Sequence, residues 1–120
     1  MRRTILVVDD SPTERRLIAN PLRQQGYQVS TANDGEEALS RAQGDQPDLI
    51  VLDVVMPKKN GFQVCRKLKM SPKTKDIKIV MLTSKDQETD RFWGLRQGAD
   101  AYLTKPFEDK MLLETVADLL

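Results

Sequence analysis

The stretch ILVVDDSPTE, residues 5–14, decides how this chain folds. Four consecutive apolar residues, a pattern typical of a strand buried on both faces, end at two adjacent acids, Asp9 and Asp10. The serine and proline that follow mark the start of a helix. Ser11 and Glu14 have the spacing of a capping box, in which each side chain bonds the backbone of the other residue. A buried strand that passes directly into a helix indicates an α/β fold.

The two adjacent acids are unusual at the end of a buried strand. Like charges side by side repel each other, and carboxylates at the edge of a core resist removal from water. We therefore expect a cationic group beside Asp9 and Asp10, because the pair would otherwise destabilise the end of the strand.

The alternation of strand and helix continues to the end of the chain. The predicted strands are 4–8, 28–31, 49–52, 77–82 and 101–104, and the predicted helices are 12–25, 34–43, 62–70, 87–97 and 108–120. Continuous apolar strands between helices are typical of a parallel sheet that is covered on both faces, with right-handed crossovers. Pro21 lies inside the first helix, which it is expected to kink or shorten.

The composition fits one domain, residues 1–120, in the cytoplasm. The 19 Lys and Arg residues nearly balance 18 Asp and Glu residues, so there is no general electrostatic reason to bind nucleic acid or an anionic membrane. No apolar run approaches the ~20 residues of a membrane span. The one cysteine, Cys65, cannot form an internal disulfide, which suits a reducing compartment. The absence of histidine excludes His-based triads, His metal sites and a phosphohistidine in this chain.

Polar side chains follow four of the five predicted strands, where ligand sites form in open parallel α/β sheets. In chain order these side chains are Asp9 and Asp10, Asp53, Thr83 and Ser84, and Lys105. Three carboxylates without a histidine or thiolate are the hard ligands that Mg²⁺ prefers. A carboxylate nucleophile, a metal ion, a lysine and a hydroxyl are together the groups that phosphoryl transfer needs.

Each of these residues taken alone also has a purely structural explanation. The three acids could end strands and cap turns, Thr83 could cap a helix, and Lys105 could be a surface lysine before a turn. Their occurrence at the ends of four different predicted strands favours a shared site.

The chain resembles the receiver domains of bacterial two-component response regulators from residue 5 to residue 120. The resemblance rests on the segments VVDDS (7–11), LIVLDVVMPKKNGF (49–62), VMLTSK (80–85) and GADAYLTKPF (98–107). It implies a flavodoxin-like, doubly wound α/β fold with five helices, in which five parallel strands lie in the order 2-1-3-4-5.

The resemblance implies a Mg²⁺-dependent phosphoacceptor site. Asp53 resembles the phosphoacceptor, which attacks the phosphohistidine of a partner histidine kinase and also faces the metal ion. Asp10 resembles the direct Mg²⁺ ligand, and Asp9 resembles a ligand that acts largely through water. The backbone carbonyl of Val55 resembles the third protein ligand.

The resemblance also implies a switch. Lys105 resembles the lysine that pairs with the phosphoryl group, and its bond to Pro106 is typically cis in this family. Thr83 resembles the hydroxyl that moves towards the phosphoryl group, and Tyr102 resembles the aromatic residue that turns inward into the vacated space. The face formed by the fourth helix, fifth strand and fifth helix is then expected to change shape for an output protein. Val55 and Lys85 occupy positions that tune the lifetime of the phosphoryl group.

Three segments narrow the resemblance further: DDSPTE (9–14), SKDQETD (84–90) and FWGLRQGADAYLTKPF (92–107). They look like the small receivers of twitching-motility and type IV pilus pathways. Because the sequence stops at Leu120, where the last predicted helix would end, we expect a stand-alone receiver without an output domain, as a monomer or weak dimer. A piece of a larger regulator would look the same. Phe92 and Trp93 are adjacent on a predicted helix, so we expect one to point outward and Trp93 to pack against the sheet. In the alternative interpretation, one of the pair anchors a partner.

Two other functions compete with the phosphorylation switch. The first is a Mg²⁺-dependent phosphohydrolase with an aspartyl-phosphate intermediate, but such an enzyme needs an acid two residues after its nucleophile, where this chain has Val55. The second is a constitutive docking receiver, which has no need to keep the acids, Thr83 and Lys105 together. A P-loop nucleotide site is not expected, because no Gly-rich loop precedes a helix.

Overall fold

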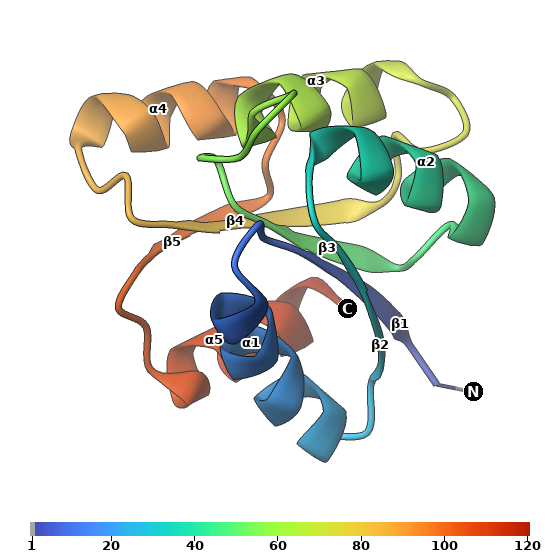
Figure 1. Cartoon of the computed structure of the whole chain (residues 1–120), viewed down its shortest axis with the longest axis vertical. Helices are drawn as coiled ribbons and strands as arrows, with labels where there is room; N and C mark the ends of the chain where they lie inside the picture. The colour runs from blue at the N-terminus through green and yellow to red at the C-terminus, as the bar shows by residue number, and fades with distance from the viewer. Residues whose placement is uncertain (1) are drawn as a thin grey trace.

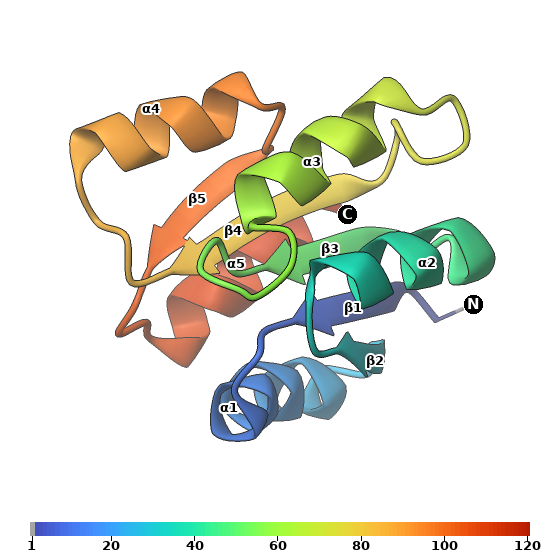
Figure 2. The ribbon, with the colours of Figure 1, turned by 45° about the horizontal axis from the view of Figure 1, so that its top comes forward.

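Five parallel strands form the centre of the protein, shown as a computed structural model that describes residues 2–120 (Figure 1). They are β1 (Thr4–Val8), β2 (Gln28–Ala32), β3 (Leu49–Leu52), β4 (Lys78–Thr83) and β5 (Ala101–Thr104). Their order in the sheet is β2-β1-β3-β4-β5, which Figure 2 shows from a tilted view. This is the predicted flavodoxin-like, doubly wound order, so the fold prediction is confirmed.

Five helices cover the two faces of the sheet. They are α1 (Pro12–Gln24), α2 (Gly35–Asp45), α3 (Gly61–Met70), α4 (Glu88–Arg96) and α5 (Asp109–Leu119). α1 and α5 lie on one face, while α2, α3 and α4 lie on the other (Figures 1 and 2). Within residues 2–120, no helix is long and apolar enough to cross a membrane.

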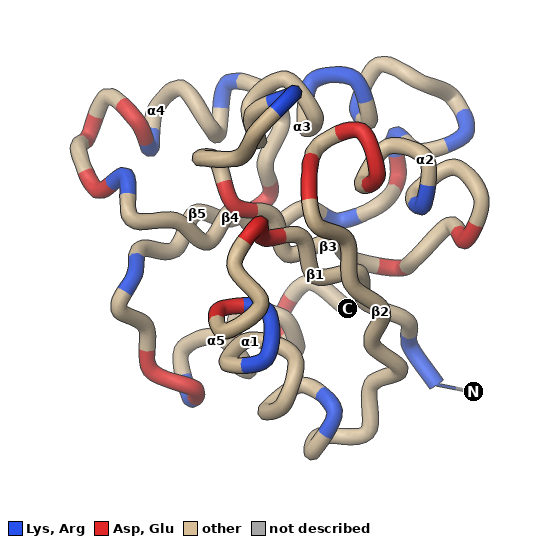
Figure 3. Tube along the Cα trace, in the orientation of Figure 1, with Lys and Arg blue, Asp and Glu red and all other residues tan. Residues whose placement is uncertain are grey.

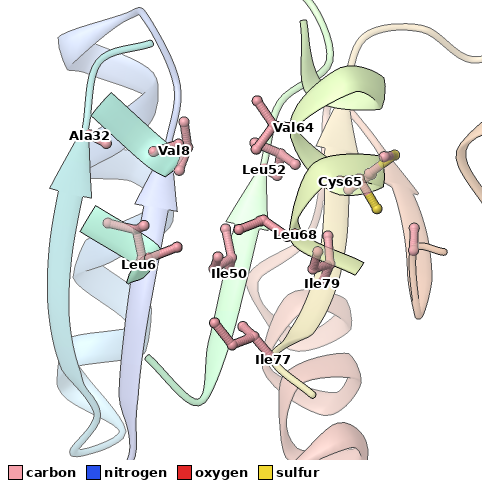
Figure 4. Close-up of a cluster of buried hydrophobic side chains, with 14 of the residues drawn as sticks. Leu6, Val8, Ala32, Ile50, Leu52, Val64, Cys65, Leu68, Ile77 and Ile79 are labelled. Atoms are coloured by element: carbon pink, nitrogen blue, oxygen red, sulfur yellow. The ribbon is translucent and has the colours of Figure 1, made fainter. Parts of the chain in front are cut away.

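The central strands β1, β3 and β4 are apolar along most of their length because both of their faces are buried. In β1, Leu6 and Val8 join the cluster under α2 and α3, whereas Ile5 and Val7 join the cluster under α1 and α5. Figure 4 shows the first cluster, in which side chains of α3 such as Leu68 point at the strands. Alternation between two cores explains why the strands read as continuous apolar runs.

The predicted boundaries are correct to within one or two residues, with one difference that affects the site. β4 ends at Thr83 instead of before it. Thr83 is therefore the last residue of a strand that is buried from its second residue onward, and its own side chain is fully buried. Of the two expected effects of Pro21, a kink or a shortened helix, the shortening does not occur, because α1 continues to Gln24. Pro21 lies in the last turn, so the bond that it cannot donate would have reached only the carbonyl of Leu17, whose side chain is exposed.

α4 presents a glycine to the sheet instead of an aromatic side chain. Gly94 is the buried residue of this helix, and a Cβ there would lie 2.8 Å from both Met81 Sδ and Tyr102 Cδ2. Phe92 and Trp93 are 63% and 50% exposed. The expectation that Trp93 packs against the sheet is therefore wrong, because the close approach at position 94 sets the rotation of the helix and turns both aromatic residues outward.

We expect Gly94→Ala to lower the free energy of unfolding by about 1–3 kcal/mol, because the added methyl overlaps the Tyr102 ring and overpacks the helix–sheet contact. Gly44→Ala in α2 is the matched control. No atom lies within 4 Å of a Cβ at Gly44, so this variant should gain roughly 0.5–1 kcal/mol from helix propensity. Urea denaturation measures both, and equal stabilities of the two variants would contradict the tight contact.

Candidate functional site

Sheet register brings the predicted site residues to one edge of the sheet. The Asp53 backbone N–H donates to the Val8 carbonyl at 3.0 Å, so the residues that follow β3 and β1 are neighbours. The Lys105 backbone N–H donates to the Thr83 carbonyl at 2.9 Å, which joins the ends of β5 and β4 in the same way. The charge-coloured trace places acidic segments at the ends of β1 and β3 (Figure 3).

The cationic group expected beside the acid pair is Lys105. Its Nζ donates to Asp9 Oδ2 at 2.7 Å and to Asp53 Oδ2 at 3.4 Å, and it lies 3.3 Å from Glu14 Oε1. The Lys105 side chain is 14% exposed and that of Asp9 is 1% exposed, so their ion pair is screened little by water. Only Asp10 of the adjacent acid pair points into solvent.

Burial and neighbouring charges act in opposite directions on Asp53 and Lys105. Burial raises the pKa of Asp53, while the Thr83 hydroxyl and the Lys105 ammonium partly oppose this and the Asp9 charge adds to it. For Lys105, burial lowers the pKa, but the hydrogen bond to Asp9 and the charge of Asp53 outweigh it, so the pKa is raised overall. The lysine is therefore charged at neutral pH and offsets the buried carboxylates.

Asp9, Asp10 and Asp53 form a cluster that fits a divalent metal ion. Each offers a carboxylate oxygen, and these oxygens all lie within 4.8 Å of one another. Oxygen donors at this spacing suit Mg²⁺, which takes one or two carboxylates and keeps several waters. Asp53 Oδ1 accepts backbone N–H groups from Val54 at 2.6 Å and from Val55 at 3.3 Å, which fixes the carboxylate against the loop.

The two predicted switch residues are bonded to the backbone of the same residue, Lys85. Its N–H donates to Thr83 Oγ1 at 3.3 Å, and its carbonyl accepts the Tyr102 hydroxyl at 2.7 Å. The Tyr102 side chain already lies inward and is 3% exposed. Burial and the nearby acids Asp90 and Asp53 raise the pKa of Tyr102 to about 12, so its hydroxyl keeps its proton at neutral pH.

Two further features of the predicted site are the Val55 side chain and the peptide bond after Lys105. The Val55 side chain is 56% exposed beside the acid cluster. The Lys105–Pro106 peptide bond is cis, as the resemblance implies.

Sequence reasoning missed the part that Glu14 plays at this site. Only half of the predicted capping box forms: the Glu14 N–H donates to Ser11 Oγ at 3.3 Å, but the Ser11 N–H donates to Asp9 Oδ1 at 3.0 Å. The Glu14 carboxylate reaches Lys105 instead. The serine–glutamate spacing is the same in both arrangements, so no signal in the sequence separates them.

Comparisons with known proteins agree with the observed fold. The chain matches the model of the response regulator receiver domain over residues 5–117. It is 45% identical to Protein PilH of Pseudomonas aeruginosa over 116 residues, which cover 97% of this chain and 96% of PilH. It is 49% identical to Response regulator PleD of Caulobacter vibrioides over 119 residues, which cover 99% of this chain but 26% of PleD.

Solved structures share the fold over the whole chain. The chemotaxis response regulator CheY4 of Vibrio cholerae superposes with a TM-score of 0.93 at 37% sequence identity, and the match covers 100% of both chains. The similarity to PilH and to CheY4 thus extends along nearly the full length of each protein, whereas PleD is about four times longer than the matched segment.

We expect Asp53→Asn to stabilise the protein at neutral pH. Because burial raises the pKa of Asp53 above the ordinary value of 3.8, the folded state binds this proton more tightly than the unfolded chain does. The ionised carboxylate therefore opposes folding above the raised pKa, and the penalty is lost as the pH falls through it. Removing the charge should raise the free energy of unfolding at neutral pH, and this gain should shrink as the pH falls towards the ordinary carboxyl pKa of 3.8.

Urea denaturation of both proteins in the presence of a chelator, repeated across this pH range, measures the difference. Asp118→Asn is the control, because it removes an exposed acid from α5 and should leave the pH dependence unchanged. If the gain in free energy of unfolding from Asp53→Asn stays constant or grows as the pH falls, burial does not raise the pKa of Asp53.

Proposed function

Because the chain belongs to the response regulator receiver family, we propose that it is a phosphorylation-dependent switch whose Asp53 accepts a phosphoryl group from a phosphohistidine of a partner histidine kinase. The observation that carries this proposal is the buried Asp53 carboxylate, which lies beside Lys105 and within an acid cluster. Receiver domains are signalling proteins, and the chemistry proposed here is confined to phosphorylation and dephosphorylation of Asp53 itself.

The two oxygens of Asp53 differ in a way that supports this role. Oδ1 accepts the two backbone N–H groups of the following loop, whereas Oδ2 faces the Lys105 ammonium. We assign Oδ2 as the nucleophile: a bond forms between this oxygen and phosphorus while the phosphorus–nitrogen bond of the phosphohistidine breaks, and the histidine leaves. Lys105 and Thr83 would then pair with phosphoryl oxygens.

Receiver domains bind Mg²⁺ at an acidic pocket, and the spacing of the oxygens in the acid cluster supports the same role here. We propose that Asp10 holds the ion directly, Asp9 largely through water, and Asp53 and the Val55 carbonyl complete the set of protein ligands. When bound, the ion would neutralise charge on the phosphoryl oxygens.

Phosphorylation adds about −1.5 to −2 charges at the end of β3. The hydrogen bonds of Thr83 and Tyr102 to the Lys85 backbone connect this position to the protein surface, so they could transmit the change in charge. If the Thr83 hydroxyl turns to the phosphoryl group, it gives up the Lys85 N–H, and the loop that also accepts the Tyr102 hydroxyl becomes free to shift. Tyr102, Phe107 and Met111 line a hollow of about 670 Å³ on the α4-β5-α5 face. We propose that an output protein reads this face, since a partner that prefers one packing shifts the balance between the two.

The similarity to PilH over nearly all of both chains supports a role in pilus or twitching-motility signalling. In this proposal residues 1–120 act as one receiver domain, as a monomer or weak dimer, without nucleic acid or a membrane as partner. A cytoplasmic location stays a prediction from the composition.

Incubation with acetyl phosphate and Mg²⁺, read by intact mass, tests the proposed chemistry. We expect the wild-type protein to gain one phosphoryl group only when Mg²⁺ is present, and Asp53→Asn to gain none, because the substitution removes the nucleophilic oxygen. Asp118→Asn should be phosphorylated like the wild type. Absence of modification at every Mg²⁺ concentration, both with acetyl phosphate and with a phosphorylated histidine kinase, would overturn the proposal and favour a constitutive docking receiver.

Val55 should lengthen the lifetime of the phosphoryl group, because an apolar side chain cannot orient an attacking water. Its side chain is exposed, so Val55→Asn should leave the core intact. We expect this variant to lose its phosphoryl group several-fold faster than the wild type after the donor is removed, measured as the decay of the phosphorylated mass. An unchanged or slower decay would show that this side chain does not control hydrolysis.

A further inference from the structure

We propose that Glu14 is a positioning residue that competes with the phosphoryl group for Lys105, so that full pairing of Lys105 with a phosphoryl group on Asp53 weakens the Glu14–Lys105 ion pair. This inference rests on the proposed function and adds a residue that opposes the phosphorylated state. Three observations carry it: the incomplete helix cap, the number of acceptors around Lys105, and the difference in burial among those acceptors.

The incomplete cap places the Glu14 carboxylate at the site. In a complete capping box this side chain would accept the Ser11 N–H. Here Asp9 Oδ1 accepts that N–H at 3.0 Å, and Asp9 Oδ2 accepts from Lys105 at 2.7 Å. Asp9 therefore takes the donor that Glu14 would have bonded, and the Glu14 carboxylate lies 3.3 Å from Lys105 Nζ. The first turn of α1 thus contributes a charged group to the candidate site.

Lys105 is surrounded by as many carboxylates as its ammonium group has donors. An ammonium group has three N–H donors and no acceptor. Three carboxylates lie within ion-pair distance of it, at 2.7 Å for Asp9, 3.3 Å for Glu14 and 3.4 Å for Asp53. A phosphoryl group on Asp53 brings further strong acceptor oxygens to the same place. The contact with Asp53 Oδ2 passes to the phosphoryl group when that oxygen bonds phosphorus. For Lys105 to donate to a second phosphoryl oxygen, Asp9 or Glu14 has to give up its contact.

Burial singles out Glu14 as the partner that leaves. The Asp9 and Asp53 side chains are 1% and 9% exposed, and both belong to the acid cluster that fits a metal ion. The Glu14 side chain is 32% exposed and lies outside that cluster, so it can turn into water with little loss. Until then its charge holds Lys105 in the arrangement of the unphosphorylated protein, which biases the switch towards that state.

Binding of beryllofluoride, a non-covalent mimic of the phosphoryl group, tests this competition at equilibrium. We expect Glu14→Gln to bind beryllofluoride in saturating Mg²⁺ about two- to fivefold more tightly than the wild type, which is the range for loss of a partly exposed ion pair. Fluorine NMR or calorimetric titration measures the affinity. Glu14→Met, which keeps the length of the side chain without its charge, should change the affinity in the same direction and by a similar factor.

Glu36→Gln is the matched control, because it removes an exposed acid from the first turn of α2, away from Lys105. Its affinity should equal that of the wild type. A merely structural role for Glu14 would lower the melting temperature and weaken binding in both Glu14 variants, and this result or an unchanged affinity would overturn the inference. If the wild type binds no beryllofluoride in saturating Mg²⁺, the proposed function fails first. Normal wild-type binding without a gain in the variants refutes only the role of Glu14.

Discussion

The ion pair between Lys105 and Asp9 is the interaction on which the rest of the site depends. Its two atoms lie 2.7 Å apart although the residues are separated by 96 positions in the chain, so it joins the first strand to the last. Without this cation, Asp9 and Asp53 would be like charges at the edge of a dry core, where each would resist ionisation. The ammonium offsets the charge of the buried Asp53 carboxylate, whose Oδ2 lies 3.4 Å from Lys105 Nζ.

The same sheet edge connects the charged site to a lightly held surface element. Thr83 and Tyr102 both bond the backbone of Lys85, and α4 rests on the Tyr102 ring through a glycine. Most of the apolar side chains of α4 are turned to solvent, so few buried contacts oppose a shift of this helix. A small change at the end of β4 can therefore alter the α4-β5-α5 face without rearranging the two cores, which α1, α2, α3 and α5 hold in place.

Much of the fold and most of the site were predictable because the strands of a parallel sheet fix where the residues at their ends lie. A parallel sheet collects the carboxyl ends of its strands at one edge, so acids at the ends of two strands and a lysine after a third were expected to converge there. The structure brings Asp9, Asp53 and Lys105 together in this way. The less predictable features belong to helices, because a helix can rotate about its axis and its side chains can choose between partners. The Glu14 carboxylate contacts Lys105 instead of the Ser11 backbone N–H, and the Trp93 side chain points away from the sheet.

The sequence by itself determined the succession of elements, the apolar strands and the residues that stand at the strand ends, because these follow from local propensity and from the period of buried positions. Only the tertiary structure decided how the charges are shared among Lys105, Asp9, Asp53 and Glu14, and which side of α4 meets the sheet. Both outcomes depend on distances between segments far apart in the chain: a carboxylate selects the nearest available cation, and a helix rotates until its smallest residue fits the closest contact. Such distances exist only after the sheet has assembled.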